Sequence, residues 1–236
     1  MKYRQLHDWN LSVSEAISIQ EALRSQVKIQ PLAAPIKLVA GADISFDKSS
    51  DKLFAAFVVL ALDTLQIVDS SSIVSQATFP YVPGLLSFRE LPPLLKAWAA
   101  LKTPPDVVFI DGQGIAHPRR FGIASHFGVL TGVPCIGCAK TLLVGNVRSL
   151  ASNVGATAPI IHQKEKVGVA LRTKKNVQPV YISVGHMIEL EEAIKLTMRC
   201  LAGYRIPEPT RQAHLLVNKL RKDFPNLHSE GQESTT

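Results

Sequence analysis

The sequence predicts an α/β fold in which one mixed β-sheet is flanked by helices. Three consecutive segments in the first third of the chain have the composition of strands, and together they suggest an antiparallel meander. Later segments alternate between strand and helix patterns, as in β-α-β units. Neither a linker nor an internal repeat divides the chain. We therefore expect a single domain over residues 1–225, followed at 226–236 by a polar tail that is expected to be disordered.

The amino-terminal half begins with a helix and continues with the three strands. Ser12 and Glu15 form a capping-box pattern that starts an amphipathic helix running toward Val27, and Pro31 and Pro35 then stop it. The three strands are predicted at residues 38–46, 53–62 and 66–79.

The second half of the chain alternates helices and strands. Helices are predicted at residues 88–101, 122–130, 190–201 and 209–224. Strands are predicted at residues 107–110, 133–137, 166–172 and 180–184, the last two as a hairpin. This order recurs in the ribonuclease-H-like fold, in which the first and fourth strands lie side by side. By analogy with that fold, Asp43 and Asp111 would lie near each other although they are far apart in the chain.

The composition is that of an ordinary globular protein with a basic charge balance. The 236 residues are 46% apolar and 19% charged, so a sizeable core can be buried. The 26 Lys and Arg residues exceed the 19 Asp and Glu residues by seven, which favours a polyanionic partner. There is no acid between Gly112 and Lys164. This stretch is therefore either a surface that faces phosphate or a solvated basic face.

The cysteines indicate a reducing compartment. Cys135, Cys138 and Cys200 are an odd number, and nothing at the amino terminus resembles a signal peptide, so we expect a cytoplasmic protein without disulfides. Cys135 and Cys138 match C-x-x-C, which is compatible with redox chemistry or half a zinc site. A pair of small buried thiols in an apolar strand is the favoured interpretation. No apolar run reaches the ~20 residues of a membrane span, so no membrane partner is expected.

A carboxylate at the end of the strand 107–110 is the first candidate for chemistry. Asp111 follows an apolar run and opens the loop 112–120, which is rich in glycines and cations. The glycines leave little side-chain bulk around the acid. An acid beside bare backbone and cations suits a metal ion and a phosphate.

A second acid, Asp43, lies within an apolar strand. Alternation places Gly41, Asp43 and Ser45 on one face of that strand. A lone buried carboxylate is costly, so such a residue is normally paired or bound to a metal. The alternative is that Asp43 merely faces solvent on an edge strand.

A stiff turn follows the third strand. Pro80 and Pro83 bracket Tyr81, and each proline ring fixes its own φ and restricts the residue before it. Such a turn presents an aromatic side chain suited to separating or replacing a stacked base. Ordinary turn packing is the alternative. Glu90, a third acid, lies near the start of the following helix, where acids are common.

Five short motifs along the chain form a specific pattern. They are GADISF at 41–46, PYVPGLLSFRE at 80–90, DGQGIAHPR at 111–119, GCAK at 137–140 and RIPEPTRQAH at 205–214. Their order and spacing, across about residues 10 to 222, resemble the endonuclease V family of deoxyinosine-specific repair nucleases. One such motif would be weak evidence, whereas five in order are specific.

The resemblance implies a metal-dependent endonuclease, a deoxyribonuclease V, that acts in DNA repair. Such an enzyme recognises deoxyinosine, which arises by deamination of adenine. It hydrolyses the second phosphodiester bond on the 3′ side of the lesion and leaves 3′-hydroxyl and 5′-phosphate ends. Mg²⁺ is the implied cofactor, with Mn²⁺ able to substitute, and the implied partner is deoxyinosine-containing DNA bound by a monomer. The alternatives are an inosine-specific endoribonuclease acting on single-stranded RNA and a non-catalytic nucleic-acid-binding protein that kept the fold.

The resemblance also implies roles for individual residues. Asp43, Glu90 and Asp111 are implied as the metal-binding acids, with Lys140 contacting phosphate and His214 lying near the metal. The residues implied in substrate binding are Tyr81, as a wedge, and Pro83, Gly84, Leu86, Gly112, His117, Arg119 and Gly137.

Three assignments have alternatives or departures. The third motif has Gln113 where other family members often have His, which leaves the role of that position open. For His214 the alternative is a surface histidine paired with Glu208 or water. Four further cations have two interpretations: they contact the nucleic acid backbone, or they are simply exposed charges. They are Arg119, Arg120, Lys174 and Lys175.

Overall fold

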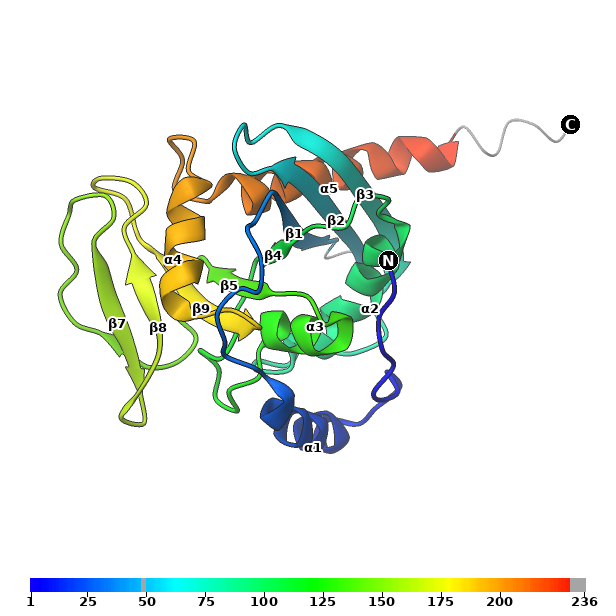
Figure 1. Ribbon diagram of the computed structural model, residues 1–236. Helices are drawn as coiled ribbons and strands as arrows, with labels where there is room; N and C mark the ends of the chain where they lie inside the picture. The colour runs from blue at the N-terminus through cyan, green and yellow to red at the C-terminus, as the bar shows by residue number, and fades with distance from the viewer. Residues whose placement is uncertain (48–49, 230–236) are drawn as a thin grey trace, which may run out of the picture.

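The computed structural model describes residues 1–47 and 50–229, and within them one sheet of nine strands is flanked by helices (Figure 1). The strands are β1 Leu38–Phe46, β2 Lys52–Ala61, β3 Ile67–Gln76, β4 Val107–Ile110, β5 Cys135–Ala139, β6 Asn146–Val147, β7 Thr157–His162, β8 Glu165–Leu171 and β9 Val180–His186. The helices are α1 Val13–Leu23, α2 Leu86–Ala100, α3 Ile123–Thr131, α4 Leu190–Arg199 and α5 Glu208–Ser229, with a 3₁₀ turn, η1, at Arg24–Gln26. The predicted α/β class is confirmed.

The strands follow the order β3-β2-β1-β4-β5-β9-β8-β7-β6. The first three form the predicted antiparallel meander, and β8 and β9 form the predicted antiparallel hairpin. β1, β4 and β5 are parallel, with α3 connecting β4 to β5 as a β-α-β unit. The sheet is therefore mixed and has the ribonuclease-H-like arrangement expected from the order of the elements.

The first and fourth strands are neighbours, as predicted. Ala42 in β1 is paired with Ile110 in β4, so Asp43 and Asp111 are the next residues along two parallel strands. The backbone N–H of Asp111 donates to the carbonyl oxygen of Ala42 at 3.2 Å. Because β1 lies between β2 and β4 and Asp43 is only 7% exposed, the alternative of a solvent-facing acid on an edge strand is wrong.

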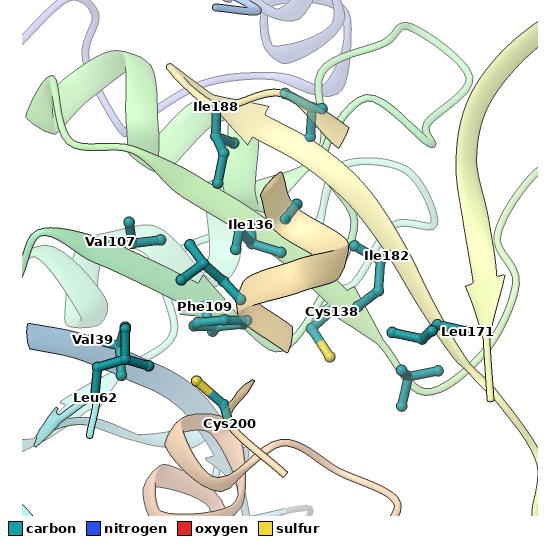
Figure 2. Packing of buried hydrophobic residues seen from close by; sticks show 14 of the residues in the cluster. Val39, Leu62, Val107, Phe109, Ile136, Cys138, Leu171, Ile182, Ile188 and Cys200 are labelled. Atoms are coloured by element: carbon teal, nitrogen blue, oxygen red, sulfur yellow. The ribbon is translucent and has the colours of Figure 1, made fainter. Parts of the chain in front are cut away.

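Helices cover both faces at the centre of the sheet. Val107 and Phe109 face a cluster that includes residues of α4 and α5, and Figure 2 shows its packing around Phe109. Val108 and Ile110 face the opposite cluster, which includes residues of α2 and α3. β4 is thus buried on both sides, which explains its continuous apolar sequence. None of the helices in the described part of the chain combines the length and the apolar composition of a membrane span.

The three cysteines are free, buried thiols. Cys138 and Cys200 pack in the cluster of Figure 2, whereas Cys135 belongs to the cluster on the other side of the sheet. Burial raises the pKa of each thiol, that of Cys200 to about 12. The C-x-x-C pair therefore does not share one site, and the interpretation as small buried thiols is supported.

Two features differ from the sequence-based expectation. β6 and β7 were not predicted, because β6 is very short and β7 contains Pro159, a residue that argues against a strand. At the other end, α5 continues to Ser229 and so enters the range 226–236 that was expected to be a disordered tail. A polar composition does not by itself end a helix that a packed segment has already nucleated. The rest of that tail, residues 230–236, lies outside the described residues.

Candidate active site

Three acids meet beside α2, where the pairing of β1 with β4 ends. Asp43 lies in β1, Asp111 directly follows β4, and Glu90 is on α2. Burial and then the charges of Asp43 and Asp111 raise the pKa of Glu90 to about 8. Burial and the charge of Asp43 raise the pKa of Asp111 to about 6, against the opposing effect of Lys140. The three carboxylates, here called the acid cluster, are therefore close enough to repel one another.

Lys140 pairs with one acid of this cluster. It follows β5, and its Nζ donates a hydrogen bond to Oδ2 of Asp111. Burial lowers the pKa of the lysine, but the Asp111 carboxylate together with Asp43 and Cys138 raises it, so the pKa rises overall. The structure thus places Lys140, the implied phosphate contact, beside the acid cluster.

His214 pairs with a second acid. The start of α5 lies directly on β1, because a Cβ at Gly41 would be only 1.9 Å from the carbonyl oxygen of Pro209. One turn later, Nδ1 of His214 lies 2.7 Å from Oδ2 of Asp43. The alternative pairing with Glu208 is wrong, because that carboxylate accepts hydrogen bonds from other side chains of its own helix.

The chemistry of the acid cluster fits a divalent cation. Carboxylate oxygens from separate elements are the ligands that Mg²⁺ prefers. Burial, followed by the neighbouring carboxylates, raises the pKa of Glu90 and of Asp111, and Lys140 opposes part of the rise only at Asp111. In the described residues, no three Asp, Glu, His or Cys side chains stand in a metal-ligating arrangement, and Asp43 and Asp111 are paired with cationic or imidazole groups instead. A metal ion would therefore have to replace these pairings.

A small cavity, of about 110 Å³, lies beside the turn that contains Tyr81. Among the residues implied in substrate binding, those that line the cavity are Tyr81, Pro83, Gly84, Leu86 and His117. The other residues that line it are Gln20, Val82, Ser87, Gln113, Gly122, Ile123 and Leu143. Four segments that are distant in the sequence thus form one pocket.

Three side chains hold one backbone carbonyl at the wall of this cavity. The carbonyl oxygen of Gly84 accepts hydrogen bonds from Gln20 Nε2 at 3.1 Å, His117 Nε2 at 2.9 Å and Arg119 Nη2 at 2.8 Å. Gly84 has φ +79°, a left-handed conformation that favours glycine. Burial and the charge of Arg119 lower the pKa of His117 to about 4, so the imidazole is neutral at pH 7. We call this arrangement the Gly84 clamp.

Two predicted glycines shape the wall without facing the cavity. Neither Gly112 nor Gly137 is among the described residues that line it, and Arg119 reaches it only through the clamp. A Cβ at Gly137 would lie 2.4 Å from the backbone nitrogen of Gly114, so the loop after β4 rests directly on β5. A Cβ at Gly112 would lie 2.5 Å from Cγ2 of Ile123. Both positions permit close packing of the loop that forms the wall.

Tyr81 lies at the rim of the cavity with its side chain in solvent. It is 69% exposed, whereas Phe79 before it and Leu85 after it are buried. The alternative of ordinary turn packing does not describe such an exposed ring. The turn therefore presents the aromatic group outward, as its two prolines predict.

Sequence reasoning assigned no role to three buried polar residues of the cavity, Gln20, Ser87 and Gln113. Gln20 has a signal in the sequence, since it occupies the helical repeat between the buried Ala16 and Leu23 of α1. Ser87 and Gln113 lie inside recognised motifs, but their side-chain contacts depend on distant segments.

The candidate backbone-contacting cations differ in how far they are already paired. Arg120 is held by Glu165 at 2.8 Å and by His162, so it is less available for phosphate. Lys174 and Lys175 are exposed in the turn between β8 and β9.

Comparison with known proteins identifies the family. A model of the endonuclease V family matches residues 21–215. An endonuclease V from Myxococcus xanthus is 52% identical over 215 residues, which are 91% of this chain and 92% of the relative. The crystal structure of an endonuclease V from Streptomyces avermitilis has a TM-score of 0.88 at 41% identity and covers 95% of this chain and 100% of that one. An endonuclease V from Ciona intestinalis, in complex with DNA containing an inosine followed by a ribo-adenosine, has a TM-score of 0.79 at 28% identity and covers 90% and 98%. With this sequence, fold and acid cluster, the chain belongs to the endonuclease V family and is a nuclease.

Proposed function

We propose that this nuclease cleaves DNA at deoxyinosine and hydrolyses the second phosphodiester bond on the 3′ side, leaving 3′-hydroxyl and 5′-phosphate ends. Mg²⁺ is its cofactor, Mn²⁺ can replace it, and the enzyme acts as a cytoplasmic monomer in DNA repair. The main support is that α2 and the loop after β4 each carry an acid of the cluster and a residue that lines the small cavity, whose rim presents Tyr81. The inosine-containing DNA bound to the Ciona relative supports the same substrate.

Recognition begins with extrusion of the damaged base. The exposed ring of Tyr81 takes the place of the base in the stack, and the base enters the cavity. A hypoxanthine pairs less well than the parent adenine, which lowers the cost of extrusion. The clamp keeps the carbonyl of Gly84 from moving, so the wall that contains Pro83 and Leu86 keeps its shape as the base enters.

Hydrolysis takes place at the acid cluster. Asp43, Glu90 and Asp111 are the residues that would hold the metal, which when bound polarises the phosphoryl group and lowers the pKa of a water. His214 orients Asp43 through its Nδ1 hydrogen bond. The ammonium of Lys140 offsets the negative charge that develops on the phosphate.

A nicking assay on matched oligonucleotides tests this proposal. Single strands carrying deoxyinosine or deoxyadenosine at one position are incubated with the protein in Mg²⁺, in Mn²⁺ and in a chelator. We expect cleavage of the deoxyinosine strand only, at the second bond on its 3′ side, and none in chelator. Equal cleavage of the deoxyinosine and deoxyadenosine strands, or cleavage that persists in chelator, would contradict the proposal.

The second candidate is an inosine-specific endoribonuclease. The Ciona complex supports testing it, because the DNA there has a ribo-adenosine after the inosine. The same assay therefore includes an inosine-containing RNA and a DNA strand with one ribonucleotide after the deoxyinosine. Cleavage of the RNA alone would favour the endoribonuclease over the proposed DNA repair enzyme.

A further inference from the structure

A chain of hydrogen bonds runs from the amino-terminal segment to the wall of the cavity. Nδ1 of His7 lies 2.6 Å from the carbonyl oxygen of Asp8, and Nε2 of His7 lies 2.8 Å from Nε2 of His126. Nδ1 of His126 lies 3.1 Å from Oγ of Ser87, which lines the cavity. His126 and Ser87 are both buried. None of these residues has a part in the hydrolysis described above.

The direction of every hydrogen bond in this chain follows from the groups themselves. A carbonyl oxygen only accepts, so His7 donates through Nδ1 to Asp8. Burial lowers the pKa of both His7 and His126, so each ring is neutral at pH 7 and has one donor and one acceptor. Nε2 of His7 therefore accepts, and Nε2 of His126 donates. Nδ1 of His126 is left as an acceptor, and the hydroxyl of Ser87 must donate to it.

Aromatic rings surround the buried histidine and keep this orientation in place. The ring centroid of His126 lies 5.7 Å from that of Trp9, 5.2 Å from that of Phe88 and 5.0 Å from that of Phe121. In such a low-dielectric environment a hydrogen bond is strong and a charge is costly. The proton of Ser87 is therefore committed to His126, and its oxygen can only accept from a ligand in the cavity.

A second acceptor in the same wall points to the same kind of ligand. Nε2 of Gln113 donates to the carbonyl oxygen of Thr141 at 2.9 Å, and this contact fixes the orientation of the amide, because a flipped amide would place two oxygens together. Oε1 of Gln113 is buried and has no hydrogen-bond partner among the described residues. A buried unpaired acceptor beside a cavity indicates that a donor comes from outside the protein.

We propose that Ser87 is a specificity-determining residue whose oxygen accepts the N1–H of the extruded base, with Oε1 of Gln113 as a second acceptor that shares the same N–H. This proposal rests on the proposed function. Hypoxanthine has an N–H at N1, whereas adenine has a lone pair there, which an acceptor repels. An oxygen that can only accept therefore favours the deaminated base over its parent. His126 and His7 are positioning residues, because they act only by fixing the proton of Ser87.

The test combines changes in the protein with changes of single atoms in the base. The substrates are single strands with deoxyinosine, with its 1-deaza analogue, which has C–H at position 1 and carries the displaced proton on O6 or N3, and with its 7-deaza analogue, which keeps N1–H. Single strands are used so that base pairing does not enter. For the wild type in Mg²⁺ we expect kcat/KM to fall between about 5- and 100-fold from deoxyinosine to the 1-deaza analogue, because a buried partner is left unpaired.

Ser87→Ala separates recognition from a structural role. Relative to the wild type, we expect kcat/KM of this variant to fall about 5- to 100-fold on deoxyinosine and on the 7-deaza substrate. On the 1-deaza substrate we expect kcat/KM to equal that of the wild type. Equal losses on all three substrates would overturn the proposal. Ser72→Ala, at an exposed position of the edge strand β3, is the matched control and should behave as wild type. Absence of wild-type cleavage on deoxyinosine would instead count against the proposed function itself.

Two changes at His7 test the positioning residues without altering the cavity. His7→Gln keeps an amide oxygen that can accept from Nε2 of His126, so it should retain the preference for deoxyinosine over deoxyadenosine. His7→Phe keeps an aromatic ring against Trp9 but has no acceptor, which frees the tautomer of His126. We expect the preference to fall several-fold in the Phe variant and to be rescued in the Gln variant. Equal behaviour of the two variants would show that the histidines do not set the orientation of Ser87.

Discussion

The acid cluster and the Gly84 clamp are joined by the loop after β4, yet they are stabilised in opposite ways. In the acid cluster, burial and the charge of Asp43 raise the pKa of Glu90 and of Asp111, and Lys140 opposes only part of the rise at Asp111. In the clamp, three donors converge on one carbonyl, and the neutral His117 has both ring nitrogens hydrogen-bonded. The difference indicates that the catalytic centre depends on an added cation, whereas the clamp is completed by side chains of the protein alone.

Removing one acid should have the largest effect. Asp111→Ala should lower the single-turnover nicking rate on deoxyinosine DNA in Mg²⁺ by about 10³-fold, because it takes away a ligand and the partner of Lys140. Binding of the same DNA in Ca²⁺ should remain measurable, since the clamp does not involve Asp111. Asp63→Ala, which breaks only an exposed ion pair, is the control and should nick normally. Normal nicking by Asp111→Ala would remove the acid cluster from the mechanism.

Removing the exposed ring at the cavity rim should affect recognition more than catalysis. Tyr81→Ala should weaken binding of deoxyinosine DNA in Ca²⁺ by about tenfold more than binding of undamaged DNA, because a base–aromatic contact is lost. Fluorescence anisotropy with the two DNAs measures both affinities. Tyr3→Ala, another exposed tyrosine, is the control. An equal loss on both DNAs would show that the ring contributes only general affinity.

Loosening the clamp should lower stability independently of metal. Gln20→Ala removes a donor to the Gly84 carbonyl and the acceptor of Arg119, so the free energy of unfolding should fall by about 1–3 kcal/mol. Urea denaturation with and without Mg²⁺ should give the same difference from wild type. Gln26→Ala, at an exposed position of η1, should change little. If Mg²⁺ restored the stability of Gln20→Ala, the two sites would not be independent.

The two regions should also respond to pH in opposite directions. The pKa of Glu90 is higher in the folded protein, at about 8, than its ordinary value of 4.5, so its contribution to stability is lost as pH rises toward 8. The pKa of His117 is lower in the folded protein, at about 4, than its ordinary value of 6.5, so its contribution is lost as pH falls from 6.5 toward 4.

Denaturation in chelator at several pH values measures this difference. Between pH 7 and pH 9 the wild type should lose about 1 kcal/mol of stability that Glu90→Gln does not lose. Mg²⁺ should reduce this loss, because a bound cation favours the ionised carboxylate. If the free energy of unfolding of Glu90→Gln changed with pH in the same way as that of the wild type, the ionisation of Glu90 would not be the cause of the loss.

Much of the fold could be predicted because the relevant signals are local. The boundaries of β1 and β4 match their predicted ranges, since buried strands are continuous apolar runs with polar or glycine residues at their ends. β7 could not be predicted, because a segment with Pro159 becomes a strand only when β8 and β6 pair with it. Pairing between strands is a tertiary property, and β-propensity is a weak guide to it.

The residues of the site also divide into those with a local signal in the sequence and those whose contacts only the tertiary structure establishes. Asp111 and Asp43 could be identified because a carboxylate at the end of or within an apolar strand is unusual, and fold analogy predicted that they would meet. Glu90 was implied only by the family resemblance, because acids are common near the start of a helix. The clamp was not found, because Gln20 and Gly84 are 64 residues apart and their hydrogen bond leaves no periodic pattern in the sequence.

By itself, the sequence determined the fold class, the family resemblance and the identity of the acids, since these depend on residue type and order along the chain. Only the tertiary structure decided which groups are paired, which are neutral and in which direction the hydroxyl of Ser87 points. Protonation and hydrogen-bond direction depend on burial and on distances between side chains, which folding alone establishes. The raised pKa of Glu90 and the lowered pKa of His126 are two outcomes of the same burial acting on groups of opposite charge.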